Sequence, residues 1–279
     1  MWRIVYQKLL PFVFLAVGCF ALIQCENSSG GEMDAAREDS TTSTSITFRL
    51  DTLYQASKQC AVDSNQCATV QLIFPYAESG PTQLCVDFNR LQLRYLKEMM
   101  QDMESDEQSN SQNLKELMGL FLADYDELLE DDLPFSMPWV MEIEGEILFQ
   151  NDKFISVQLQ QYTFTGGAHP NSFNTIWMLD KTTGEPLDFK GLVADTDTLL
   201  PIAEAAFRKT IELPITKTLA DAGYFQGEDF FLPQNYGLVE KGLLLYYNTY
   251  EVAPYVVGPT QVLIPFSDLQ PVFKTDNWY

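Results

Sequence analysis

The chain has 279 residues and a formal net charge of -22, with 46% hydrophobic and 13% aromatic residues. This length and apolar content suffice for a substantial core, in one large domain or two smaller ones. So negative a potential repels phosphate groups, which excludes nucleic acid as a partner and disfavours anionic lipid surfaces. It would attract a cationic partner, although the same charge also keeps an exported protein soluble.

The first 24 residues have the pattern of a bacterial export signal. Arg3 and Lys8 give a positive start, and an apolar run follows over residues 9–23. That run is shorter than the roughly 20 residues that a membrane-spanning helix needs. We therefore expect residues 1–24 to be a cleaved signal peptide.

The apolar run ends at Leu-Ile-Gln-Cys, which resembles a lipidation motif and predicts a lipid on Cys25. Cys19, which follows a glycine, is the alternative site. Either cysteine predicts a membrane-anchored lipoprotein of the cell envelope that faces the periplasm or the exterior, whereas ordinary secretion would leave the chain unanchored. Residues 25–45 are polar and poor in large apolar side chains, which predicts a disordered tether.

Residues 46–137 are expected to form an N-terminal α+β subdomain. Apolar and polar residues alternate in its strands, with Ile46, Phe48 and Leu50 on one side of the first. Apolar residues recur at helical spacing in the two segments that follow. The expected bounds are 46–54 and 70–75 for the strands, and 84–104 and 114–129 for the helices.

The cysteines after the tether predict a disulfide. The compartment outside the cytoplasm permits disulfides, and Cys60 and Cys67 lie close together across an expected turn. A bridge from Cys85 to either of them stays open. A metal site is not expected, because the chain has one histidine and no Cys-x-x-Cys spacing. No cofactor is expected either.

Residues 138–279 are expected to form a C-terminal α+β domain. Three closely spaced segments with two-residue periodicity predict an antiparallel meander, and a mixed helical and strand-like region follows. The overall prediction is an α+β fold with a helical N-terminal part, the meander and a C-terminal mixed α/β region. The expected strands are 139–147, 154–159, 173–179, 230–233, 238–247 and 261–266.

A helix is expected over residues 195–212. Asp197 or Thr198 would cap its N-terminus, since short polar side chains accept hydrogen bonds from free backbone N–H groups there. Its predicted inner stripe consists of Leu199, Ile202, Ala206 and Ile211.

The connection after the second meander strand has an unusual composition. It contains Gly166 and Gly167, which allow backbone conformations closed to other residues. It also holds His169, the single histidine of the chain, which Pro170 biases toward extended geometry. This connection is therefore the first place to look for a site.

A second segment, Tyr-Glu-Val-Ala-Pro-Tyr at 250–255, completes a family pattern. Together with Thr-Gly-Gly-Ala-His-Pro at 165–170, it resembles a bacterial envelope domain family over residues 48–273. Members include the RsiV-type anti-sigma factor, whose outer domain binds lysozyme, and the region beside the catalytic domain of PdaC-type peptidoglycan deacetylases. The resemblance implies an α+β fold in which the two segments are neighbours in space.

The chain departs from both relatives in function. An anti-sigma factor needs a cytoplasmic segment and a spanning helix, and the only long apolar run here is at the N-terminus, so sigma-factor binding is not implied. Deacetylase chemistry needs several metal ligands, and this chain has a single histidine. The resemblance therefore implies binding in the envelope more directly than catalysis.

The two segments supply the candidate site residues. His169 is the candidate base and Glu251 the candidate acid, although a structural hydrogen bond is the commoner role for each. The tyrosines suit either core packing or stacking on carbohydrate. The expected ligand-binding residues are Tyr162, Gly166, Gly167, His169, Asn171, Tyr250, Glu251 and Tyr255.

We therefore expect a non-enzymatic lipoprotein that binds a partner in the cell envelope. That partner would be a lysozyme-like cationic protein or a peptidoglycan fragment. The alternative is a glycan-processing enzyme of the cell wall that uses His169 and Glu251.

Overall fold

The computed structural model describes residues 45–101, 113–130 and 137–273. The predicted signal peptide, both lipidation cysteines and nearly all of the expected tether lie outside these ranges. The described residues all belong to one compact unit. Among the described residues, none of the helices has both the length and the apolar character needed to cross a membrane.

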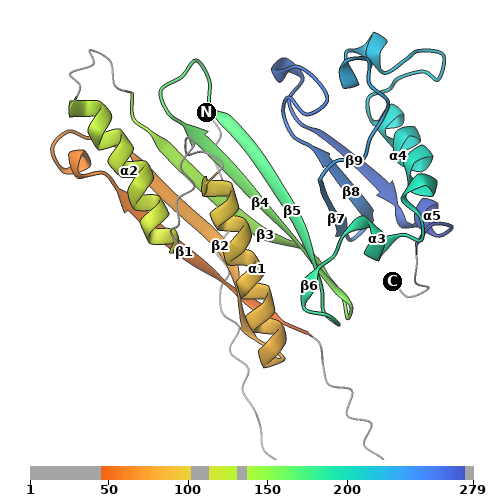
Figure 1. The fold of residues 1–279 in the computed structure, drawn as a ribbon, viewed down its shortest axis with the longest axis horizontal. Coiled ribbons are helices and arrows are strands. Elements are labelled where there is room, and N and C mark those ends of the chain that lie inside the picture. Colours follow the sequence, from red (N-terminus) through yellow and green to blue (C-terminus); the bar gives the residue numbers. More distant parts are fainter. Residues whose placement is uncertain (1–44, 102–112, 131–136, 274–279) are drawn as a thin grey trace, which may run out of the picture. The chain divides into compact units, whose positions relative to one another are not determined.

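A six-stranded sheet forms the larger part of the unit, with strand order β1-β2-β3-β4-β5-β6 (Figure 1). Every neighbouring pair is antiparallel except β2 and β3, which are parallel. Strands β3, β4 and β5 form the predicted antiparallel meander, and the α+β class is confirmed. The strands are β1 (Thr47–Ala56), β2 (Thr69–Ser79), β3 (Val140–Gln150), β4 (Phe154–Phe164), β5 (Asn171–Asp180) and β6 (Glu185–Pro186).

Two helices, α1 (Thr82–Gln101) and α2 (Leu114–Glu130), lie between β2 and β3 in sequence. Their apolar stripes pack on one face of the sheet, because each presents large side chains at three- and four-residue spacing. Leu96, Leu117 and Tyr125 belong to the same buried cluster as strand residues Leu72 and Ile143. Both predicted helices are therefore present, with the start of α1 two residues earlier than expected.

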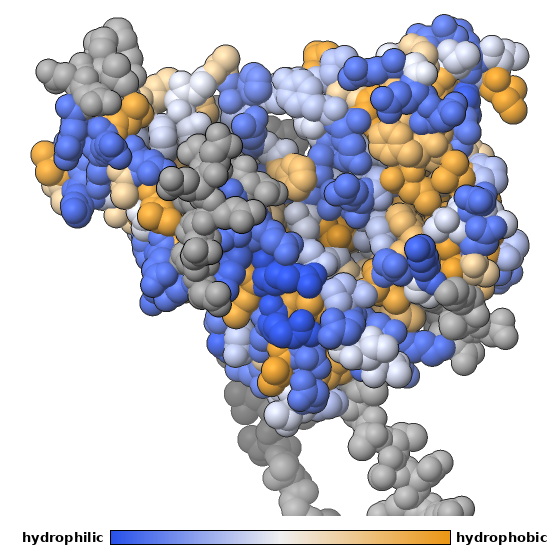
Figure 2. All heavy atoms as spheres, in the orientation of Figure 1, coloured by the Kyte–Doolittle hydropathy of each residue, from blue (hydrophilic) through white to orange (hydrophobic). Residues whose placement is uncertain are grey.

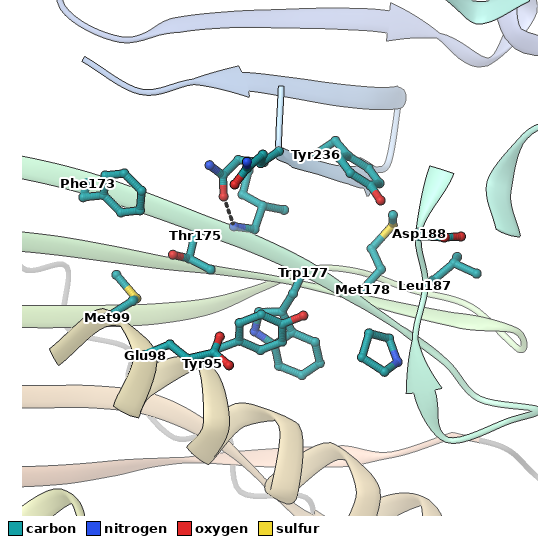
Figure 3. Close-up of a pocket in the computed structure, with 14 residues that line it drawn as sticks. Tyr95, Glu98, Met99, Phe173, Thr175, Trp177, Met178, Leu187, Asp188 and Tyr236 are labelled. Atoms are coloured by element: carbon teal, nitrogen blue, oxygen red, sulfur yellow. Dashed lines mark hydrogen bonds between the residues drawn. The ribbon is translucent and has the colours of Figure 1, made fainter. Parts of the chain in front are cut away.

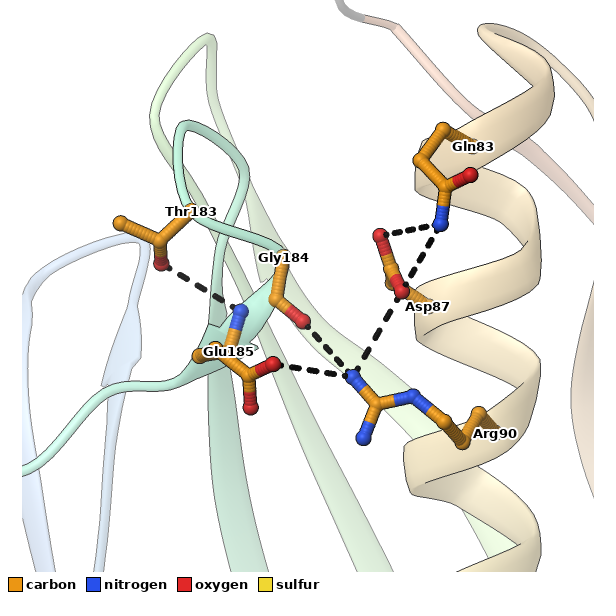
Figure 4. A network of polar contacts seen from close by, with 6 residues as sticks. All are labelled: Gln83, Asp87, Arg90, Thr183, Gly184 and Glu185. Carbon is orange, nitrogen blue, oxygen red and sulfur yellow. Dashed lines mark hydrogen bonds and ion pairs between the residues drawn. The ribbon is translucent and has the colours of Figure 1, made fainter.

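Polar contacts fasten α1 to the turn between β5 and β6 (Figure 4). A guanidinium nitrogen of Arg90 donates to the Gly184 carbonyl at 3.2 Å and lies 3.4 Å from a Glu185 carboxylate oxygen. Asp87 approaches Arg90 from within α1, at 3.5 Å. Gly184 has φ of 73°, and a Cβ there would lie 2.5 Å from Asp87, so this turn requires glycine. These contacts hold α1 close to β5.

The second sheet is three-stranded and antiparallel, with order β7-β8-β9. Its helix α4 packs through a buried cluster centred on Phe207 and Tyr247. The elements are β7 (Asn235–Val239), β8 (Gly242–Tyr247), β9 (Thr260–Pro265), α3 (Phe189–Leu192), α4 (Thr196–Thr210) and α5 (Phe266–Leu269). Short 3-10 turns are η1 (Lys58–Ala61), η2 (Ala220–Ala222), η3 (Phe225–Gly227) and η4 (Tyr255–Val257).

Strand β7 packs directly on the face of the first sheet that α1 and α2 leave uncovered. At Gly237 a Cβ would lie 2.3 Å from the Ser156 hydroxyl and 2.7 Å from a methyl carbon of Ile176. Glycine is therefore what allows the two sheets to approach this closely. This contact places the second sheet beside the outer edge of β5.

Several expected bounds in the C-terminal part are wrong. Residues 230–233 form no strand, and their aromatic rings instead join the cluster around Phe207. The run 238–247 is two strands, β7 and β8, joined by a tight turn at Glu240 and Lys241. Apolar residues of β8 are buried on both faces, so they do not alternate with polar residues. Without that alternation, the sequence did not show where one strand ends and the next begins.

The cap and stripe of α4 also differ from expectation. Asp195 caps the helix, because its carboxylate accepts a hydrogen bond from the Asp197 backbone N–H at 3.0 Å, so Asp197 and Thr198 are inside the helix. The buried stripe consists of Leu199, Ala203 and Phe207. Ile202, Ala206 and Ile211 are partly buried beside it.

The three residues predicted to share one side of the first strand, Ile46, Phe48 and Leu50, do not share one environment. Ile46 is buried, but Leu50 is 65% exposed. The register with β2 shifts between Thr47 and Phe48, so Ile46 lies before the shift and Leu50 after it. Because β1 is also an edge strand, burial of Ile46 does not imply burial of Leu50.

Cys60 and Cys67 form a disulfide with an S–S distance of 2.00 Å, and Cys85 on α1 has a free, partly buried thiol. The six-stranded sheet also crosses the boundary expected at residues 137 and 138, since β2 pairs with β3 from Thr69 to Ile73.

Candidate functional site

Two kinds of hollow differ in their lining. One, of about 810 Å³ between α4 and β9, is lined mainly by aliphatic side chains such as Ile202 and Leu263. Figure 2 shows apolar residues gathered over these elements. The outer edge of β5 instead adjoins three hollows lined by aromatic rings and amides. Because ligand sites combine apolar surface with a few placed polar groups, the β5 edge is the candidate site.

Side chains replace a neighbouring strand along much of this edge. Strand β6 pairs with β5 only at Leu179 and Asp180. Further along, the Asn174 backbone N–H donates to Asn248 Oδ1 at 2.8 Å, and Asn248 Nδ2 donates to the Asn174 carbonyl at 2.9 Å. The Ile176 N–H donates to Asn235 Oδ1 at 3.0 Å. These amides satisfy buried edge groups and leave the space beside β5 free of a strand.

A buried polar network continues from this edge. Asn174 Nδ2 donates to the Tyr246 hydroxyl at 2.7 Å, and its Oδ1 accepts from Gln158 Nε2 at 2.6 Å. Burial raises the pKa of Tyr246, so its hydroxyl stays neutral at physiological pH. The network fixes β4, β5 and β8 relative to one another.

The three hollows have volumes of about 370, 250 and 540 Å³. Phe173 lines all three and is 45% exposed. They therefore form one groove along β5, which we call the β5 groove. In the 370 Å³ hollow, Tyr95, Glu98 and Met99 of α1 lie on one side and Tyr236 of β7 on the other (Figure 3).

The two segments that were singled out in the sequence meet at one end of this groove. The His169 ring stacks on Tyr255, with centroids 4.0 Å apart and an angle of 24° between the planes. The Tyr255 hydroxyl donates to the Pro170 carbonyl at 3.3 Å. Tyr250 lies beside Tyr255 and has φ of 71°, a left-handed conformation that is rare for an aromatic residue.

The candidate residues divide between the groove and its surroundings. Asn171, Tyr250 and Tyr255 line the 250 Å³ hollow, and Glu251 lines the 540 Å³ hollow together with Tyr250. Gly166, Gly167 and His169 belong to the supporting loop, where Gly166 has φ of 83°. Tyr162 faces away from the groove, because it alternates with Gln161, which lines it.

Sequence reasoning did not find most of the groove. Phe173 and Trp177 were assigned to a strand, and Asn235 and Asn248 had no assigned role. One signal was available, since Gln158 and Asn174 are polar residues within the largely apolar strands expected over 154–159 and 173–179. Buried amides within strands require partners, which points to a network or a ligand.

The contacts of His169 and Glu251 are local. His169 is exposed, and its Nδ1 lies 3.1 Å from the Pro170 carbonyl oxygen. Glu251 Oε2 accepts the Asn248 backbone N–H at 2.7 Å, which closes the turn that carries Asn248. Both contacts support loop structure. In the parts of the chain that the structure describes, no cluster of three metal-ligating side chains occurs.

Burial raises the pKa of Glu251 above its ordinary 4.5, and the Asn248 N–H partly offsets this. A carboxyl whose pKa is raised by folding destabilises the folded state once it is ionised, so stability falls as pH rises through 4.5 and the raised pKa. We predict that Glu251→Gln, which keeps an acceptor oxygen, is at least as stable as wild type at about pH 7, with the advantage lost near pH 4.

Urea unfolding at both pH values checks this prediction. Glu251→Ala is the control, because it removes the acceptor and should be less stable at either pH. A Gln variant less stable than wild type at pH 7 and equal to it at pH 4 would show the opposite sign, a stabilising charge.

Two family matches divide the chain. Residues 61–172 match the family described as "Deacetylase PdaC", and residues 189–267 match DUF3298, described as a "Protein of unknown function". The first spans α1, α2 and the meander up to the start of β5, and the second spans α3 to β9. The predicted link to RsiV-type anti-sigma factors stays a prediction.

Two curated relatives match part of the chain. "Immunogenic protein MPT64" of Mycobacterium tuberculosis and "Immunogenic protein MPB64" of Mycobacterium bovis are each 30% identical over 116 residues. The match covers 40% of this chain and 49% of each relative, so the chain spans about half the length of these curated relatives.

Solved structures show the same fold. A DUF3298 family member from Bacteroides fragilis has a TM-score of 0.70 at 16% identity, and one from Pseudomonas aeruginosa has 0.60 at 19%. Each comparison covers 84% of this chain and 96% of the solved chain. The PdaC match points to an extracytoplasmic, envelope-associated protein. The chain contains a domain of the PdaC and DUF3298 type, with its PdaC-type part in residues 61–172 and its DUF3298 part in residues 189–267.

Proposed function

We propose that this chain is a non-enzymatic binding module of the bacterial cell envelope and that the β5 groove holds a peptidoglycan fragment. The observation that carries the proposal is the groove itself, in which Phe173 joins three hollows lined by aromatic rings and amides. Flat aromatic rings suit the apolar faces of sugar rings, and planar amides suit their hydroxyl and carbonyl groups.

Three observations support a location of this chain in the cell envelope. The disulfide between Cys60 and Cys67 fits an oxidising compartment, and the PdaC match fits the same location. The N-terminal sequence supplies a signal and an attachment cysteine, Cys25 or Cys19. We therefore propose a lipoprotein whose anchor holds the groove close to the wall.

A pull-down with purified wall sacculi tests the proposal. The full chain should bind sacculi, and Phe173→Ala should weaken binding about tenfold, which corresponds to about 1.4 kcal/mol for a lost stacking contact. Tyr54→Ala is the matched control, because Tyr54 is a 61% exposed ring on β1 at the far edge of the sheet. No binding by wild type, or equal loss in both variants, would reject the groove as the glycan site.

A cationic protein such as lysozyme is the second candidate, and the net charge of -22 favours it. Long-range attraction would speed association and weaken with salt, because the Debye length falls from about 10 Å at 0.1 M to about 3 Å at 1 M. We predict that lysozyme binding falls steeply over this range while sacculus binding changes little. Equal lysozyme affinity at both salt concentrations would remove charge as its basis.

The enzymatic alternative is tested in the same preparation. Release of soluble fragments from sacculi by wild type, abolished in His169→Ala and Glu251→Gln, would replace the binding proposal with glycan processing.

A further inference from the structure

We propose that the β5 groove recognises the N-acetyl groups of a neutral amino-sugar oligomer and therefore prefers acetylated to de-N-acetylated glycan. This inference rests on the proposed function and names the chemistry of its ligand. It follows from which hydrogen-bonding groups of the groove have partners and which do not.

Two buried donors at the groove lack partners among the described residues. Gln161 is 6% exposed, lines the 250 Å³ hollow, and has no hydrogen-bond partner for its Nε2. Trp177 is 3% exposed, lines the 370 Å³ hollow, and has none for its Nε1. Buried donors are almost always satisfied in folded proteins. Other buried polar groups of the described residues, such as Gln92 and Ser156, also lack a partner, but Gln161 and Trp177 are the ones that line this groove, and this favours a ligand that supplies their acceptors.

The three carboxylates of the groove, by contrast, each have a partner within the protein. Glu251 accepts from the Asn248 N–H, and Asp188 accepts from the Gly191 N–H at 2.8 Å while it caps α3. Glu98 lies 3.5 Å from Arg94 Nε. The three carboxylates would repel an anionic ligand. The missing partner is therefore a neutral group that accepts hydrogen bonds.

Strand geometry sets the length of such a ligand. Gln161 is directly opposite Phe173 in the β4–β5 pair, and Trp177 follows Phe173 by four residues on the same face. At about 3.3 Å per residue, the two donors are separated by about 13 Å along the strand. A ligand that meets both must be an oligomer, and Phe173 lies level with the end that meets Gln161.

An acetamido group fits the lining between these donors. Its carbonyl oxygen accepts from an amide or indole N–H, and its methyl group can pack on Met99, which lines both hollows. Figure 3 shows Met99, Thr175 and Trp177 around the same space. An ammonium group has three donors and no acceptor, so the nitrogen substituent of a de-acetylated sugar cannot accept from either N–H group.

Calorimetry on the full chain tests the preference with three probes of equal length: N-acetylglucosamine oligomers, their de-N-acetylated forms, and glucose oligomers. About 0.5 M salt suppresses non-specific attraction of the cationic oligomer to this acidic chain. We expect the acetylated oligomer to bind at least about tenfold more tightly than the de-acetylated one, as one lost hydrogen bond implies. Glucose oligomers, which offer hydroxyl acceptors only, should bind with intermediate affinity.

Gln161→Leu tests the donor directly, and Gln160→Leu is the matched control. Gln160 is the adjacent residue, exposed on the opposite face of β4. The Gln161 variant should lose about tenfold in affinity for the acetylated oligomer while it melts no lower than wild type, because an unpaired buried donor has been removed. Trp177→Phe, which keeps a ring and loses the N–H, is the second variant.

The outcomes separate this inference from the proposed function. Binding of sacculi with equal affinity for acetylated and de-acetylated oligomers, unchanged in Gln161→Leu and Trp177→Phe, would overturn the inference and leave the function intact. Failure of wild type to bind sacculi or any oligomer would overturn both.

Discussion

Replacing Asn248 with alanine is expected to lower the free energy of unfolding by about 3 kcal/mol. Its side chain both accepts from the Asn174 N–H and donates to the Asn174 carbonyl. Alanine would leave two buried backbone groups of β5 unsatisfied, and each such group costs about 1–3 kcal/mol. Urea unfolding monitored by circular dichroism measures the loss.

Alanine variants of two other asparagines provide comparisons for this loss of stability. Asn235→Ala removes one bond to the same edge, to the Ile176 N–H, and should cost about half as much. Asn171→Ala, at the exposed start of β5, should change stability by no more than about 0.5 kcal/mol. If all three variants were equally stable, the hydrogen bonds from Asn248 and Asn235 to the β5 backbone would not contribute to stability as the bonds of a paired strand do.

The same asparagines explain why the site was only partly predictable. The sequence identified the loop with Gly166 and the segment with Tyr250 as neighbours, and the His169–Tyr255 stack shows them together. It did not indicate that β5 would be left without a full partner strand. That depends on β6 being only two residues long and on where the second sheet packs, both of which are tertiary effects.

Side chains alternate between the two faces of a sheet along a strand, so the face of a residue follows only once the residue is known to belong to that strand. Tyr162 was grouped with the loop that follows it, but in β4 it alternates with Gln161 and so points away from the groove. Phe173 was read as one more apolar strand residue. Its exposure results from the absence of a neighbouring strand beside it, which no local pattern records.

The main elements were predictable because their apolar residues follow a regular pattern over many residues. Both long N-terminal helices have one buried face each, and β3 alternates buried with exposed residues over Met141–Glu144, which produces a strong period. Strands β4 and β5 are buried on both faces over Phe154–Leu159 and Ile176–Leu179, so their apolar composition carried that part of the prediction. The C-terminal part was harder. Strand β8 is buried on both faces, and residues 230–233 are apolar because their rings fill the core around Phe207 without pairing in a sheet.

Phe207→Ala is expected to have the largest effect on stability, about 3–5 kcal/mol. Phe207 is fully buried on α4, and its ring is 5.2 to 5.7 Å from those of Tyr224, Phe225, Phe230 and Tyr247, in mostly edge-to-face geometry. Alanine would leave a cavity at the centre of this cluster and remove the edge-to-face contacts, each worth about 0.5–1.5 kcal/mol beyond burial.

The change should also reach the β5 groove, because Tyr247 directly precedes Asn248. The Tyr247 hydroxyl donates to the Phe231 carbonyl at 2.7 Å, and burial raises its pKa, so the cluster holds the start of the Asn248 turn in place. Urea unfolding with Ile215→Ala as the 91% exposed control measures stability, and sacculus binding measures the groove. A folded Phe207→Ala chain with full stability loss and wild-type sacculus binding would show that the groove is fixed by the Asn174 network alone. Reduced binding in the folded variant would place the aromatic cluster among the groups that position Asn248.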